Sequence, residues 1–317
     1  MSDKIYTVEL NIPDITPYRE GNTGVDYVTT FDSGVEGPHV MISALVHGNE
    51  ICGALALDHL FREGIRPFHG KLTLAFVNVA AFERFDPKSP DDFRFVDEDF
   101  NRTWGEDVLD GDRDTVETRR AREIRPIVDQ ADYLLDIHSM QHPCVPLMMT
   151  GPAEKGRQLA RDIGFPEYAV TDKGHDAGKR MRDYSPFLDP DSPRNALLVE
   201  CGQHWESSSE DVAIESAYRF LLQFGLIEKD VAKPYLSSDL PDQKLVEVEG
   251  PVTIASDEGF RFSESWLGFD VIEKAGTVIG WDGDKPVATP FDDCVLIMPS
   301  RRLTKGNTAV RLGRILS

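Results

Sequence analysis

An apolar run, a helix and a second apolar run, in that order, most constrain the fold of this chain. Residues 40–46 are almost entirely apolar and have the length of a buried strand. Residues 51–63 carry apolar side chains at roughly helical spacing and stop at Gly64, and another apolar run follows at residues 72–79. A strand, helix and strand in this order predict a crossover unit and therefore a parallel sheet.

The middle of the chain continues this alternation after a long interruption. Residues 83–114 are rich in Asp, Pro and Arg and show no period, which predicts a loop that is functional or disordered. Residues 115–130 predict a charged helix that is interrupted or ends near Pro126. Two further buried strands and one helix are expected at residues 133–138, 196–200 and 209–224.

The pattern changes after about residue 235. Residues 244–317 read as strands separated by Gly and Asp turns. We therefore predict a mixed, largely parallel α/β sheet flanked by helices over residues 1–235, the larger domain. A small all-β domain over residues 236–317 follows it.

The charge balance restricts the partners of the protein. The chain has 55 acidic and 34 basic residues, a net charge of -21, which disfavours nucleic acid and anionic membranes. Its four cysteines show no paired spacing, and no apolar run approaches the roughly 20 residues of a membrane span. The N-terminus shows no signal segment either, so a cytoplasmic protein is expected; a homo-oligomer is compatible with the sequence.

Polar residues that bind metals lie at the predicted strand ends. His47 and Glu50 follow the first buried strand and, three residues apart at a helix start, can converge on one ion. Such a pair alone occurs by chance in many proteins. His138 ends another predicted strand, and two imidazoles with one carboxylate are the ligand set of a catalytic zinc site with its fourth position open to water. We predict one zinc ion per chain on these residues.

Two carboxylates could support that ion. Asp136 lies two residues before His138 on the same side of a strand, so it either accepts a hydrogen bond from the imidazole or pairs with an arginine. Glu200 ends an apolar strand, where a lone carboxylate is costly to bury. It is our candidate catalytic base, with a salt-bridged strand end as the alternative.

Asn101 and Arg102 end the long loop. The guanidinium fork of arginine matches a carboxylate, and asparagine adds a donor. Taken alone, Arg102 favours the interpretation of a solvated loop side chain, and a pair that binds a carboxylate is the alternative.

Together these pieces resemble the succinylglutamate desuccinylase and aspartoacylase family, relatives of the zinc carboxypeptidases. Each motif is weak alone, whereas the ordered set is specific. The resemblance covers residues 38–225 and, more loosely, the β-rich tail. The motifs are His47-Gly48-Asn49-Glu50, Asp99-Phe100-Asn101-Arg102, Asp136-Ile137-His138 and Val199-Glu200-Cys201-Gly202.

The resemblance implies a zinc-dependent deacylase that hydrolyses the amide bond of a small N-acyl amino acid. It implies zinc on the two histidines and Glu50, and Glu200 as general base and later general acid. It also implies that Asn101 and Arg102 grip a substrate carboxylate. A metallocarboxypeptidase acting on peptides and a non-catalytic zinc-binding protein are the alternatives.

The chain departs from the family pattern after its second strand. Aspartoacylases carry Asn-Pro-Arg-Ala there, whose arginine helps to hold the oxyanion, whereas Ala80 takes that place here. Arg84 and Arg94 in the following loop are candidates to replace it, and Arg94 is counted among the expected substrate-binding residues. Arg180 or Arg182 is a candidate second arginine on the substrate side.

A second departure lies in the tail. Aspartoacylase supplies a substrate-contacting tyrosine there, whereas Phe269 or Trp266 aligns with it here and has no hydroxyl. Both departures argue against acetylaspartate as substrate. With Phe260 and Phe262 these aromatic residues either wall the pocket or, the reading we favour, form the core of the β domain.

Overall fold

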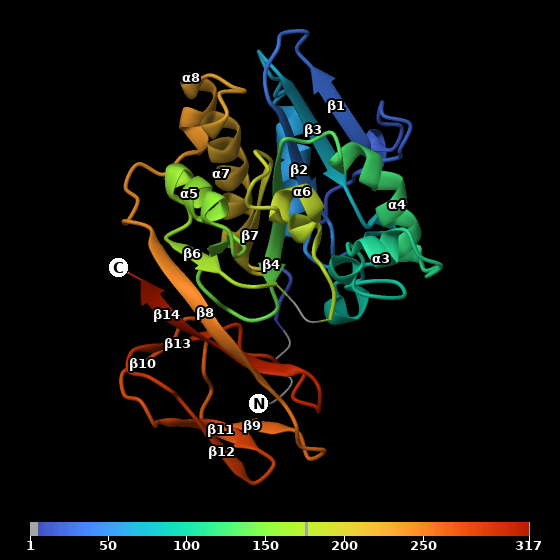
Figure 1. The fold of residues 1–317 in the computed structure, drawn as a ribbon. Coiled ribbons are helices and arrows are strands. Elements are labelled where there is room, and N and C mark those ends of the chain that lie inside the picture. The colour runs from blue at the N-terminus through green and yellow to red at the C-terminus, as the bar shows by residue number, and fades with distance from the viewer. Residues whose placement is uncertain (1–5, 175–176, 317) are drawn as a thin grey trace.

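A large mixed sheet organises the protein, which we describe from a computed structural model covering residues 6–174 and 177–316 (Figure 1). Within the described residues eleven strands join in the order β1-β3-β2-β4-β7-β5-β6-β8-β14-β13-β10. Their bounds are β1 Val28–Asp32, β2 His39–Ala44, β3 Lys71–Phe76, β4 Tyr133–Met140, β5 Leu147–Met149, β6 Tyr168–Thr171, β7 Asn195–Gln203, β8 Lys244–Thr253, β10 Val271–Ile272, β13 Cys294–Ile297 and β14 Thr308–Leu316.

Helices cover both faces of the central strands. One hydrophobic cluster lies under α1, α5 and α7, and a second lies under α4 and α6 on the opposite face (Figure 1). The α-helices are α1 Ile51–Arg62, α2 Val79–Phe82, α3 Glu106–Leu109, α4 Val116–Val128, α5 Glu154–Ile163, α6 Ser185–Leu188, α7 Ser208–Gln223 and α8 Lys229–Ala232. Short 3-10 helices are η1 Thr16–Tyr18, η2 Pro90–Phe93, η3 Phe100–Arg102, η4 Met181–Asp183 and η5 Lys233–Tyr235.

The predicted fold class is confirmed. Strand β2 pairs in parallel with both β3 and β4, and β4 pairs in parallel with β7. Residues of these strands are buried from both sides, because each face packs against its own layer of helices. The carboxyl ends of β2, β4 and β7 therefore meet at one edge of the sheet. Strands β1 and β5 run antiparallel to their neighbours β3 and β7, which makes the sheet mixed.

One local prediction differs from the structure. The stretch of residues 83–114 contains η2, η3 and α3, so it is not one irregular loop. The helix expected over residues 115–130 is α4, and it ends near Pro126 as predicted, at Val128. A proline this close to the end of a helix removes a single backbone hydrogen bond, and the last turn tolerates that loss.

The C-terminal strands extend the main sheet. Strand β8 pairs in parallel with β6, with Tyr168 opposite Lys244, and β14, β13 and β10 follow it. A separate sheet contains β12 (Lys285–Ala288), β11 (Val278–Asp282) and β9 (Phe260–Phe262). This part of the chain has hydrophobic clusters of its own, and the division near residue 235 stays a prediction.

None of the helices in residues 6–174 and 177–316 is both long and apolar enough to cross a membrane.

Candidate active site

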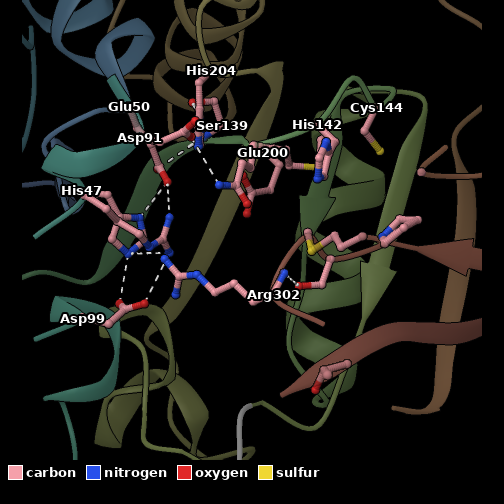
Figure 2. Close-up of a pocket in the computed structure, with 18 of the residues that line it drawn as sticks. His47, Glu50, Asp91, Asp99, Ser139, His142, Cys144, Glu200, His204 and Arg302 are labelled. Atoms are coloured by element: carbon pink, nitrogen blue, oxygen red, sulfur yellow. Dashed lines mark hydrogen bonds and ion pairs between the residues drawn. The ribbon is translucent and has the colours of Figure 1, made fainter. Parts of the chain in front are cut away.

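The carboxyl edge of the sheet brings the predicted metal ligands together. His47 and Glu50 lie between β2 and α1, and His138 lies in β4 with Glu200 opposite it in β7. One ligand atom each from His47, Glu50 and His138 lies within 4.8 Å of the others. Figure 2 shows His47, Glu50 and Glu200 around the same cavity.

The turn after β2 is shaped to present this group. Leu45 has a φ of 60°, in the left-handed region that branched side chains rarely occupy. A Cβ on Gly48 would fall 2.4 Å from the backbone carbon of Ala81, so this position requires glycine. Glu50 precedes α1 but does not cap it. Its carboxylate is therefore free to contact His47 and His138.

Glu50 joins the two histidines. Its Oε1 lies 2.7 Å from His47 Nδ1, and its Oε2 lies 2.8 Å from His138 Nδ1. Burial opposes the charge of Glu50, but the two imidazoles lower its pKa well below the usual value. Two imidazole nitrogens and a carboxylate oxygen facing one point are the donors that zinc prefers, so the residues present fit the ion.

Each histidine also contacts a carboxylate through its other ring nitrogen. Asp136 Oδ2 lies 2.8 Å from His138 Nε2, and Asp136 Oδ1 accepts a hydrogen bond from Ser43 Oγ at 2.7 Å. His47 Nε2 lies 3.0 Å from Asp99 Oδ1. With Nε2 donating to Asp136, His138 Nδ1 keeps its lone pair for a metal. His47 Nε2 also lies 2.9 Å from Arg94 Nη2, which can only donate, so this contact does not place the proton of His47 on Nε2. Of the two interpretations of Asp136, the structure shows the contact with imidazole.

Glu200 lines the cavity beside this group. Its Oε2 is buried and has no hydrogen-bond partner among the described residues, which differs from a salt-bridged strand end. Burial and the nearby Glu50 carboxylate raise the pKa of Glu200 to about 8. A buried carboxylate oxygen without a partner is costly, so we interpret Glu200 as a group kept for chemistry.

Arg94 is the loop arginine that reaches this site. Its Nη1 donates to Glu50 Oε1 at 3.0 Å, and its Nη2 donates to Asp99 Oδ2 at 3.3 Å. Arg84, the other candidate replacement for the arginine missing at Ala80, is exposed and does not line the cavity. The geometry therefore favours Arg94.

Asn101 and Arg102 are placed differently from each other. Arg102 lines the cavity, and its Nη1 donates to the Asn101 carbonyl at 2.7 Å. The buried Asn101 side chain lies 3.3 Å from His138 Nε2 through its Nδ2, and its Oδ1 accepts from the Met181 backbone N–H at 3.0 Å. It contacts a candidate ligand rather than the cavity surface, and a role in substrate binding stays a prediction.

The other arginine candidates have structural partners. Arg180 donates to Asp172 through both Nη atoms, at 3.1 and 2.7 Å, and also contacts Asp183. Arg182 donates to Asp183 Oδ1 at 2.7 Å and to the carbonyl of Thr150 at 2.9 Å. Neither guanidinium lines the cavity.

Three of the four aromatic residues of the tail pack inside the C-terminal part, and Phe269 packs against β6. The Phe269 and Tyr168 ring centroids lie 4.6 Å apart, and Trp266 Nε1 donates to the Ile279 carbonyl at 3.1 Å. Phe260 and Phe262 belong to the clusters of this part as well, and none of the four lines the cavity.

The C-terminal part forms one wall of the cavity, through residues other than the aromatic ones considered from the sequence. The cavity has a volume of about 490 Å³, within the range of small-molecule sites. Met298, Arg302 and Arg311 line it from the segments around β13 and β14. His204 lines it as well, where burial lowers its pKa to about 3 and its Nδ1 lies 2.8 Å from Ser139 Oγ.

Glu117 is a positioning residue that the sequence did not reveal. It is fully buried on α4, and its carboxylate accepts from the backbone N–H groups of Val96, Asp97 and Glu98 at 2.7, 3.1 and 3.2 Å. It also accepts from Asn78 Nδ2 at 3.1 Å. These bonds hold the loop between Arg94 and Asp99, and the highly charged composition of α4 gave no reason to place this side chain inside.

Replacing Glu117 by Gln is expected to lower the free energy of unfolding by about 2 kcal/mol, because an amide nitrogen leaves buried N–H groups without an acceptor. Denaturant unfolding followed by circular dichroism measures this loss. The control is Glu123→Gln on the same helix, whose side chain is 59% exposed and should change stability by less than about 0.5 kcal/mol. Equal effects in the two variants would contradict the role of Glu117.

Comparison with known proteins gives a consistent result. The model of the succinylglutamate desuccinylase/aspartoacylase catalytic domain matches residues 36–203, more than half of the chain. The comparison with curated proteins found no match.

Solved structures share the fold. Succinylglutamate desuccinylase from Vibrio cholerae is 18% identical with a TM-score of 0.68, over 92% of this chain and 86% of that one. Succinylglutamate desuccinylase from Chromobacterium violaceum is 14% identical with a TM-score of 0.67, over 92% and 89%. The product-bound ectoine utilization protein EutE from Ruegeria pomeroyi is 15% identical with a TM-score of 0.61, over 92% of both chains.

Proposed function

The chain belongs to the succinylglutamate desuccinylase/aspartoacylase family, and from this premise we propose that it is a zinc-dependent deacylase that hydrolyses the amide bond of a small N-acyl amino acid. One observation carries the proposal. The Nδ1 atoms of His47 and His138 face the same carboxylate in a cavity of about 490 Å³. Beside them lies Glu200 Oε2, which has no hydrogen-bond partner in the part of the chain that the structure describes.

In this proposal His47, Glu50 and His138 hold one zinc ion. Zinc, when bound, polarises the acyl carbonyl and lowers the pKa of the attacking water. Asp136 and Asp99 lie against Nε2 of the two imidazoles and orient the rings, so that the two Nδ1 atoms face the ion.

The side chains of this site have separate tasks during hydrolysis. Glu200 takes the proton of the attacking water at its carboxylate and delivers it to the amide nitrogen, which leaves as an amine. Arg94, whose guanidinium lies beside Glu50, stabilises the negative charge that develops on the carbonyl oxygen. Arg102, on the cavity wall, binds the substrate carboxylate.

Replacing Arg102 by Ala is expected to raise KM for carboxylate-bearing substrates about 10- to 100-fold with a smaller change in kcat, because a charge-assisted contact made by the bound substrate is lost. Steady-state kinetics with N-acetyl amino acids measure KM and kcat of the variant and of the wild-type protein. The matched control is Arg119→Ala. It removes an exposed arginine of α4 that pairs with Asp114. An unchanged KM in the Arg102 variant would mean that the carboxylate is bound elsewhere.

The proposal is tested by a screen of the zinc-loaded protein against N-acetyl, N-formyl and N-succinyl amino acids and against peptides. Turnover of N-acyl amino acids without cleavage of peptides supports it. Cleavage of C-terminal residues from peptides would instead identify a carboxypeptidase. Zinc binding without any turnover would identify a non-catalytic zinc protein.

The setting of the enzyme is also a proposal. We expect it to act in the cytoplasm on a small molecule, with no nucleic acid or membrane as partner. Assembly as a homo-oligomer stays a prediction that sedimentation equilibrium would decide.

A further inference from the structure

The cavity has a cationic end. Arg94 donates to Asp99 at 3.3 Å, and Asp99 and Arg311 lie close enough to Arg102 for their charges to act on its pKa. Figure 2 shows the Arg302 side chain extending from the C-terminal segment toward Asp99. Four arginines thus line this end, in a protein whose net charge is -21. Such a concentration of guanidinium groups favours a carboxylate.

The other end of the cavity is apolar. Met140, Cys144 and Met298 line it and pack in one hydrophobic cluster, with Pro143 and Pro299 beside them. Burial raises the pKa of the Cys144 thiol to about 12, so this sulfur carries no charge at neutral pH.

Among the described residues, the polar groups near this end offer no positive charge to a ligand. Burial and the nearby Arg301 lower the pKa of His142 to about 4, so its imidazole is neutral. Asp91 lines the cavity here and accepts from Gln141 Nε2 at 3.3 Å. Arg301 is near Asp91, at 4.0 Å, but does not line the cavity. A second substrate carboxylate would therefore meet apolar side chains and a negative charge, which is unfavourable.

The catalytic groups lie between the two ends. Figure 2 shows Glu200 between His47 and Asp99 on one side and His142 and Cys144 on the other. The charge of Glu200 acts on the pKa of both Arg94 and Cys144, which places it near both ends. An amide bond at this position must extend one part of the substrate toward the arginines and the other toward the methionines.

We propose that the apolar end, formed by Met140, Cys144 and Met298, binds the acyl group, so that the substrate class is an amino acid N-acylated by an apolar chain. This inference rests on the proposed function. The amino acid carboxylate lies toward the arginines, and the scissile amide lies at Glu200. The acyl chain lies against the thioether and thiol groups, where a dicarboxylic acyl group such as succinyl is disfavoured.

The test compares acyl groups on one amino acid. The zinc-loaded protein is assayed with N-acetyl-, N-butanoyl-, N-hexanoyl- and N-succinylglycine, of which butanoyl and succinyl differ only by a terminal carboxylate in place of a methyl group. We expect kcat/KM to rise roughly fourfold per methylene, and succinyl to fall at least about tenfold below butanoyl. A preference for succinyl over butanoyl, or for acetyl over both longer chains, would overturn the inference.

Two variants locate the acyl chain. Met298→Lys places a cation at the apolar end and should reverse the ratio of butanoyl to succinyl, whereas Met298→Leu should keep it. An unchanged ratio in a folded Met298→Lys protein would overturn the inference. If that variant does not fold, the comparison of acyl groups on the wild-type protein decides the question.

Failure of the proposed function can be distinguished from failure of this inference. If the wild-type protein hydrolyses no N-acyl amino acid, the proposed function fails. Calorimetric titration with N-hexanoylglycine and N-succinylglycine then tests the cavity alone. Tighter binding of the hexanoyl compound supports the apolar site, and tighter binding of the succinyl compound overturns it.

Discussion

Replacing Glu200 by Gln is expected to lower kcat about 10²- to 10⁴-fold while zinc content and KM change little. The amide cannot take the proton of the attacking water, and Glu200 is not one of the three residues that hold the metal in our proposal. Kinetics with an N-acyl amino acid and metal analysis of the purified variant measure both parts. The control is Asp91→Asn, which alters another carboxylate of the same cavity and should lower kcat only a few-fold.

The pH dependence of the same variant sharpens the test. Glu200 acts as a base only when deprotonated, and burial with the Glu50 charge raises its pKa to about 8. A divalent cation held by Glu50 would lower that pKa, so the acid limb of kcat/KM should lie below pH 8 in the wild-type protein. Glu200→Gln should lose this limb. If turnover survives the substitution with its acid limb intact, another group is the base.

The parts of the site that the sequence predicted are those that follow from strand ends. His47, His138 and Glu200 each come at or near the end of an apolar run, and parallel pairing aligns such ends at one edge. Local pattern and general topology were therefore enough to bring them together. The same reasoning identified Asp136 as a neighbour of His138, because alternate residues of a strand share a face.

Other features depend on contacts that no local pattern encodes. The pairing of β8 with β6 joins Tyr168 to Lys244, far apart in the chain, and so places Met298 and Arg302 on the cavity wall. The loop over residues 83–114 also shows no periodic pattern, so the sequence does not tell which of its side chains point toward the site. This is why Arg94 could not be separated from Arg84 beforehand.

Removing the metal is expected to abolish activity and lower the unfolding temperature. A ligand bound only by the folded chain at a hundred times its dissociation constant adds about 2.7 kcal/mol to the free energy of unfolding. For a chain of this size that raises the unfolding temperature by about 4 °C. Thermal unfolding with added zinc, and again after a chelator, measures the shift. A midpoint that does not respond to zinc would contradict the metal site.

Replacing His138 by Ala is expected to remove both the bound zinc and this shift. The substitution deletes one of three ligands and leaves Asp136 and Glu50 without the imidazole between them, at 2.8 Å from each. The zinc content found by metal analysis should fall from about one ion per chain to near zero. His142→Ala is the matched control, because His142 lines the same cavity outside the ligand set and should keep the ion. If the His138 variant binds zinc as tightly as the wild type, then the two strands do not share an ion, and the hydrolase proposal loses its foundation.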